Sequence, residues 1–185
     1  MKQLINAQSS VAELLSLRPH VCKLDPVLTA KALGKLRELM EKEKVPLGAD
    51  GEGFVGAVLE RTAELARAGL FEAANIVSTI SRSLKLGVRP SAAARDAIVG
   101  EAFRLFSEAC SEKHAAFFTR LLELWEVPPS SLPELGPLQR AQEATAEGDR
   151  AGAEVGFELD DVAGLLDSLA DAMRKSGGGE NSGGG

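Results

Sequence analysis

Aromatic residues and cysteines are scarce in this sequence. Of its 185 residues none is Tyr, one is Trp, seven are Phe and two, Cys22 and Cys110, are Cys. Two distant thiols predict no disulfide framework and favour a reducing, intracellular compartment. The alternation of β-branched and aromatic residues typical of half-buried strands is also missing, while Ala and Leu dominate the apolar set, which favours helix over strand. The sequence therefore predicts an all-α protein.

Long apolar runs are missing as well. No stretch approaches the roughly 20 apolar residues that a membrane-spanning helix needs. Residues 1–6 lack the apolar core of a secretory signal peptide. We therefore expect no membrane among the partners of this chain.

Charge is unevenly distributed along the chain. The net charge of −6 divides into about +1 for residues 1–128 and −7 for residues 129–185. A near-neutral N-terminal part attracts phosphates only weakly, so nucleic-acid binding would have to depend on a local basic face.

Six amphipathic helices are predicted within the first 126 residues. We expect them at 9–17, 26–44, 53–68, 71–86, from 91 onward and at 112–126, with a Gly- and Asp-rich turn at 47–53. Helix starts and ends are indicated by capping signals at Ser10 with Glu13, Asp25 before Pro26, Gly69, Gly87, and Ser91 after Pro90.

A similar motif, in which Val is followed by Pro within two residues, ends three of these helices; we call it a Val-Pro stop. Val45-Pro46, Val88-Arg89-Pro90 and Val127-Pro128 recur at spacings of 43 and 39 residues. A period near 40 with two helices per unit is typical of an α-solenoid, here of about three helical hairpins over residues 1–128. The alternative is a six-helix bundle in which the prolines are unrelated.

The C-terminal third differs in composition. Residues 129–156 form a linker rich in Pro, Ala, Gly and Glu, residues 157–175 an acidic amphipathic helix, and residues 176–185 a disordered Gly/Ser-rich tail. The 157–175 helix is expected to cover the end of the helical array, or alternatively to meet a partner's groove.

A family resemblance appears in the fourth predicted helix. The sequence there reads LFEAANIV at 70–77 and LKLGVRP at 84–90. This pattern resembles an octotricopeptide repeat and the related helical arrays of FAST-kinase-like proteins, and the resemblance covers roughly residues 5–128. It implies a protein that binds RNA in a mitochondrion or plastid and acts in RNA metabolism or translation.

Candidate RNA-contacting residues lie mainly on the second helix of each predicted pair. Polar side chains there would bond the edges of unstacked bases, and Lys or Arg would neutralise phosphates. The candidates are Lys31, Lys35, Asn75, Thr79, Arg82, Lys85, Arg89 and Arg120. Lys31 and Lys35 are four residues apart and should share one face of their helix. The simpler interpretation of each is a solvated helix surface.

Neither a catalytic site nor a metal site is indicated by the sequence. No nucleophile with a base and an orienting group stands out, so we predict no enzyme. The pairs Cys110 with His114 and His20 with Cys22 are incomplete as zinc sites, so no metal or cofactor is expected. The alternative to single-stranded RNA as the partner is protein: a degenerate repeat serving as an interaction scaffold within a larger assembly.

Overall fold

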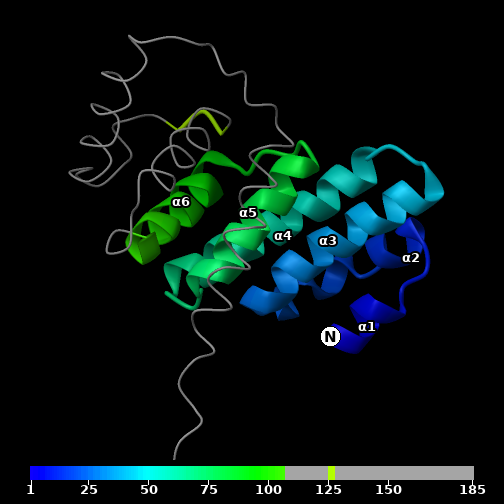
Figure 1. The fold of residues 1–185 in the computed structure, drawn as a ribbon, viewed down its shortest axis with the longest axis horizontal. Coiled ribbons are helices and arrows are strands. Elements are labelled where there is room, and N and C mark those ends of the chain that lie inside the picture. Colours follow the sequence, from blue (N-terminus) through cyan, green and yellow to red (C-terminus); the bar gives the residue numbers. More distant parts are fainter. Residues whose placement is uncertain (107–124, 128–185) are drawn as a thin grey trace, which may run out of the picture.

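The described part of the chain is built from helices. The computed structural model describes residues 1–106 and 125–127. Along these residues the order is α1 (Lys2–Ala7), α2 (Val11–Leu15), the 3-10 helix η1 (Arg18–Lys23), α3 (Pro26–Glu43), α4 (Ala49–Arg67), α5 (Ala73–Lys85) and α6 (Ala92–Phe106) (Figure 1). No strand occurs over these two ranges, which confirms the all-α prediction. The predicted helix at 112–126 lies almost wholly outside the described residues, as do the predicted linker, acidic helix and tail.

Capping residues fix the helix starts where the sequence predicted them. Ser10 accepts a hydrogen bond from the backbone N–H of Glu13 at 3.2 Å, and Asp25 accepts one from that of Leu28 at 2.9 Å. Each satisfies a backbone donor that the first turn of a helix leaves without a partner. Ser91 does the same for α6 by accepting from Ala94.

The first half of the described chain departs from the prediction in three places. Helices α1 and η1 were not expected, and α4 begins at Ala49 rather than at 53. The predicted Gly- and Asp-rich turn is therefore largely helical. Asp50 and Glu52 lie in the first turn of α4, where negative charge complements the helix dipole.

The four long helices pack in two layers, one formed by α3 and α5 and the other by α4 and α6. Helix α3 lies against α5, and α4 lies against α6, while contacts within α3–α4 and α5–α6 join the layers. Figure 1 shows α3, with α1 and α2 beside it, on one side of the array and α6 on the other. Both short helices pack on α3. The second helices of the first two predicted pairs, α3 and α5, are thus neighbours. The predicted pairing of α4 with α5 is wrong, because α4 packs on α3 and α6 while α5 packs on α3 and α6.

One apolar core runs through the array. The predicted stripes of α3, α4 and α6 supply buried residues that include Leu33, Leu36, Phe54, Val58 and Ile98. Helix α5 differs because it is buried on nearly every side, including Ser78, Thr79, Ser81 and Ser83. Its central position places polar side chains inside the protein.

Each of the three Val-Pro stops follows a residue in the left-handed conformation. Lys44, Gly87 and Glu126 have φ of 56°, 69° and 52°, and each immediately precedes the Val of its stop. After α3, the N–H of Val45 bonds the carbonyl of Met40, which is the longer hydrogen bond of a Schellman ending. The stops thus share a backbone conformation as well as a sequence.

Within residues 1–106 and 125–127, no helix combines the length and apolar character required to cross a membrane.

Candidate functional site

A groove between α3 and α5 brings together three of the predicted RNA contacts. We call it the basic groove. It has a volume of about 400 Å³ and is lined by Asn6, Lys31, Gly34, Lys35, Glu38 and Arg82. Three cationic side chains against one carboxylate give the lining a net charge of +2.

Lys31 and Lys35 lie one turn apart on α3, as predicted. Lys35 is held in place: its Nζ is 2.6 Å from Glu38 Oε1, and its side chain is only 18% exposed. Fixing a lysine in this way lowers the conformational entropy that it would lose on meeting an anion, although Glu38 neutralises part of its charge.

Arg82 enters the groove from α5. Its Nη1 donates a 2.6 Å hydrogen bond to the carbonyl oxygen of Ala30 on α3. The guanidinium also lies over Gly34, where a Cβ would approach within 3.2 Å. The missing side chain of Gly34 therefore makes room for Arg82 beside the two lysines. Neither Gly34 nor Glu38 was predicted, although Glu38, three residues after Lys35, could have been found from helical spacing.

Asn6 is another residue that the sequence analysis missed. It lies on α1, which was not predicted as a helix, and α1 packs on α3. Its amide offers both a donor and an acceptor beside the cations. The groove lining thus combines cationic donors with one uncharged group that can bond an unpaired base.

The prediction for Thr79 is wrong. Its side chain is fully buried, its Oγ1 donates to the carbonyl of Asn75 at 3.0 Å, and it lies 3.2 Å from the hydroxyl of Thr29. A residue sealed between α3 and α5 has no route to a ligand. The residue one turn earlier, Asn75, is half-buried and its amide is 3.5 Å from Glu72 Oε2.

The remaining candidates lie elsewhere. Lys85 lines a different groove at the ends of α3 and α5, and Arg89 forms an ion pair with Glu126. Arg120 lies outside the described residues. The basic groove therefore brings candidates from two helices, α3 and α5, to the same surface depression.

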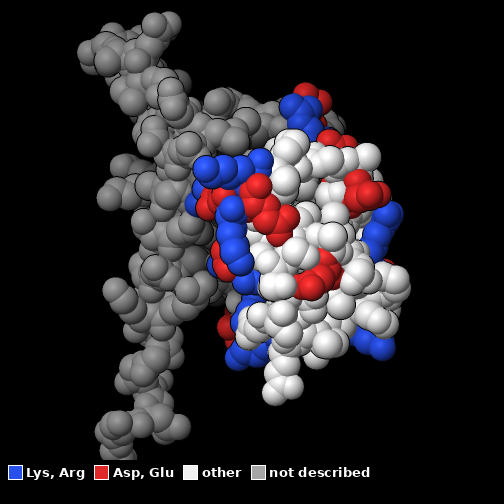
Figure 2. Space-filling view, turned by 90° about the vertical axis from the view of Figure 1, so that its right-hand side faces the viewer, with Lys and Arg blue, Asp and Glu red and all other residues white. Residues whose placement is uncertain are grey.

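Charge on the surrounding surface is mixed. Figure 2 shows Lys and Arg gathered along one edge of the face in view, with Asp and Glu among them. Opposite charges also pair on α3, where Arg37 Nε lies 2.7 Å from Glu41 Oε1. The face in view therefore carries charges of both signs rather than a continuous positive strip.

The groove is lined mainly by hydrogen-bond donors. Its lining contains ammonium, guanidinium and amide donors with one carboxylate, and no His, Cys, Ser or Thr. No group of three His, Cys, Asp or Glu residues suited to a metal occurs among the residues that the structure describes. Cys22, which the sequence pairs with His20 as an incomplete zinc site, is exposed and carries a free thiol.

The described residues thus form an array of helices with a groove lined by three cationic side chains. Comparison with models of protein families, with curated protein sequences and with solved structures finds no match in any of the three.

Proposed function

We propose that this chain is a non-catalytic helical-repeat protein that binds single-stranded RNA through the basic groove. The observation that carries this proposal is that Lys31, Lys35 and Arg82, from helices about 50 residues apart in sequence, line the same groove. Such cations bind phosphates, while Asn6 can bond a base edge. The family resemblance adds the expectation of a mitochondrial or plastid transcript.

The repeat architecture is part of the same proposal. Packing of α3 on α5 and of α4 on α6 is the pattern expected of two stacked hairpins, α3–α4 and α5–α6, in a short α-solenoid, one helix out of register with the predicted pairs. The left-handed residue before each Val-Pro stop supports equivalence of the three units. A simple up-and-down bundle would instead place consecutive helices α4 and α5 as major neighbours.

The test is titration of a fluorescently labelled, unstructured RNA against the full chain. Changing Lys31 and Lys35 to Ala should weaken binding, and adding Arg82→Ala should weaken it further. The matched control changes Lys2, Lys23 and Lys42 to Ala, because these three exposed lysines remove the same charge outside the groove. Each lost phosphate contact should reduce the slope of log K against log salt by about 0.7.

Protein binding is the second candidate, favoured by a separate observation. Cations predicted to contact RNA are engaged within the chain: Lys35 with Glu38, Arg82 with the Ala30 carbonyl, and Arg89 with Glu126. Equal RNA affinity of the groove and control variants, or no affinity in either, would remove the RNA proposal in favour of a protein scaffold.

A further inference from the structure

A second groove lies at the C-terminal ends of α3 and α5. We call it the apolar groove because Met40, Val45, Pro46 and Leu86 contribute its apolar lining. Arg37, Glu41, Lys44 and Lys85 complete the lining, and the groove has a volume of about 610 Å³. It shares no residue with the basic groove, so an occupant of the apolar groove is independent of RNA binding.

Two features of this groove point to an occupant. Val45 remains 38% exposed, although it is a large apolar side chain beside other apolar residues. Around it, Arg37, Lys44 and Lys85 outnumber Glu41, which is paired with Arg37 at 2.7 Å. An apolar lining with a cationic rim matches an amphipathic helix whose polar side is acidic.

The chain itself contains a segment with this chemistry. Residues 157–175 place apolar side chains at helical spacing, namely Val162, Leu165, Leu166, Leu169 and Met173. The acidic side chains of this segment are Glu158, Asp160, Asp161, Asp167 and Asp171. We propose that residues 157–175 bind in the apolar groove of the same chain, with their apolar stripe on Met40, Val45 and Leu86 and their carboxylates toward Lys44 and Lys85.

The connection is long enough for binding within one chain. Twenty-nine residues separate Val127 from Phe157, and a flexible linker of that length has a mean end-to-end distance of about 30 Å. Helix α3, with 18 residues, is about 27 Å long. Such tethering gives an effective concentration on the order of millimolar, so even weak complementarity suffices for a populated contact.

Hydrogen exchange of the full chain, followed by mass spectrometry, tests the proposal. An isolated helix of this length exchanges rapidly, so docking should slow exchange across 157–175 at least tenfold. Lys44→Glu should abolish this protection, and adding Asp161→Lys should restore part of it. The control is Lys42→Glu, which places the same charge in the last turn of α3 outside the groove and should leave the protection intact.

Three results would overturn the proposal. The first is fast exchange of 157–175 in the unmodified chain. The second is protection that Lys44→Glu and Lys42→Glu change equally. The third comes from zero-length cross-linking in a mixture of isotopically light and heavy chains: links from Lys44 or Lys85 to the acidic segment that form only between chains would make a second copy the occupant. Unchanged Trp125 fluorescence confirms that each variant is folded.

Discussion

The side chain of Arg82 on α5 lies directly over Gly34 on α3, where an added Cβ would stand 3.2 Å from three guanidinium atoms. Ala in a helix interior is normally more stable than Gly by about 1 kcal/mol. We expect Gly34→Ala not to gain this stability, because the added Cβ would force Arg82 to shift. In an Arg82→Ala background the same substitution should recover it, and urea unfolding of the four proteins measures the difference.

Gly100 provides the control for this cycle. It lies within α6, and a Cβ there would meet no other atom within 4 Å. Gly100→Ala should therefore stabilise the protein by about 1 kcal/mol whether or not Arg82 is present. Equal effects of Gly34→Ala in both backgrounds would show that Arg82 does not depend on the space above Gly34.

Changing Thr79 to Val is expected to leave RNA affinity unchanged and to alter the free energy of unfolding only slightly. Its hydroxyl has one proton, which bonds the Asn75 carbonyl, and Thr29 likewise donates to the Pro26 carbonyl at 2.9 Å. Thr29 therefore keeps a partner when Thr79 is changed to Val. The free energy of unfolding should change by no more than about 1 kcal/mol, and RNA affinity should stay as it is. A clear loss of affinity at unchanged stability would restore Thr79 as a contact.

Substitutions at Lys44 and Gly87, two of the left-handed residues before the Val-Pro stops, are expected to change the stability in opposite directions. A non-glycine residue in this conformation is strained by roughly 1 kcal/mol or more. Lys44→Gly should therefore stabilise the protein by about 0.5–1 kcal/mol, whereas Gly87→Ala should destabilise it by about 1 kcal/mol. Thermal unfolding of both variants checks this. The assigned conformations are wrong if the two substitutions act in the same direction.

The sequence predicted helix positions best where a cap and an apolar stripe agree. For α3, Asp25 and Pro26 give the start and a continuous Leu stripe gives the buried face, so predicted and observed bounds differ by one residue. The start of α4 was missed because Gly51 and Gly53 resemble a turn, yet both are helical and Gly51 gives space to Leu47. The presence of glycine therefore does not by itself distinguish a turn from the start of a helix.

The burial of α5 could not be inferred from its sequence. Two of its hydroxyl side chains bond their own helix: Ser83 Oγ donates to the Ile80 carbonyl at 2.8 Å, and Thr79 Oγ1 donates to the Asn75 carbonyl at 3.0 Å. A Ser or Thr that bonds its own helix in this way can be buried without an outside partner. Polar residues on a helix therefore do not identify its exposed face. Lys31, Lys35 and Arg82 reach the surface of the groove, as expected of long charged side chains, which rarely become fully buried.

Glu13 links the stability of the N-terminal region to pH. Its carboxylate accepts hydrogen bonds from the backbone N–H of Ser9 at 2.8 Å and from the Ser9 hydroxyl at 2.9 Å. These bonds, the backbone one first, hold the pKa of Glu13 below its ordinary value. A lowered pKa contributes stability that is present above the ordinary carboxyl pKa of about 4.3 and is lost as the pH falls through the lowered one.

Glu13→Gln should accordingly destabilise the protein at pH 7 and have less effect at pH 3. Urea unfolding of the unmodified chain and the variant at the two pH values measures this. Ser9→Ala removes the hydroxyl but keeps the backbone bond, so it should show a smaller effect with the same direction. A loss of stability in Glu13→Gln that does not change with pH would exclude the carboxylate as its cause.

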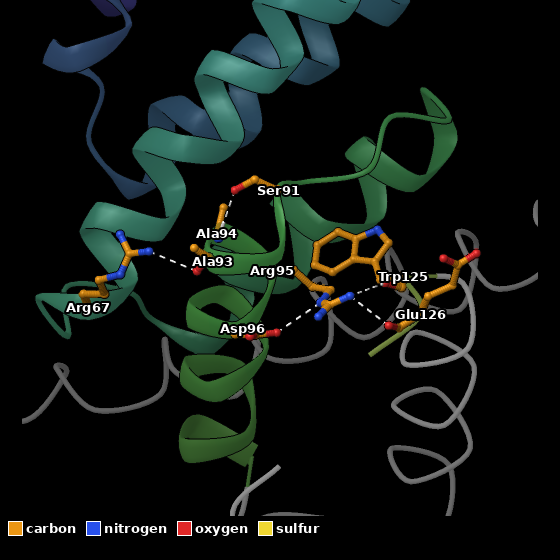
Figure 3. A network of polar contacts seen from close by, with 8 residues as sticks. All are labelled: Arg67, Ser91, Ala93, Ala94, Arg95, Asp96, Trp125 and Glu126. Atoms are coloured by element: carbon orange, nitrogen blue, oxygen red, sulfur yellow. Dashed lines mark hydrogen bonds and ion pairs between the residues drawn. The ribbon is translucent and has the colours of Figure 1, made fainter. Parts of the chain in front are cut away.

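Arg95 ties the described segment at residues 125–127 to α6. Figure 3 shows its side chain reaching from α6 to the backbone of Trp125 and Glu126. Nη1 donates to the carbonyl oxygens of both residues, at 3.2 Å and 2.8 Å, and Nε lies 3.0 Å from Asp96 Oδ1. These bonds give two backbone carbonyls outside any described helix the hydrogen-bond partner that a backbone acceptor needs. The position of Trp125, whose side chain is buried, therefore depends on Arg95.

Trp125 is the single tryptophan of the chain, so its fluorescence reports this attachment directly. Arg95→Ala should shift the emission to longer wavelength and increase quenching by acrylamide, because hydrogen bonds from a charged donor contribute about 1.5–3 kcal/mol each. Arg89→Ala is the matched control. Arg89 pairs with Glu126, but the two side chains are 59% and 70% exposed, and such surface pairs contribute at most about 1 kcal/mol. Equal quenching in the two variants would mean that burial of the indole, rather than the arginine bond to the backbone, holds this segment against α6.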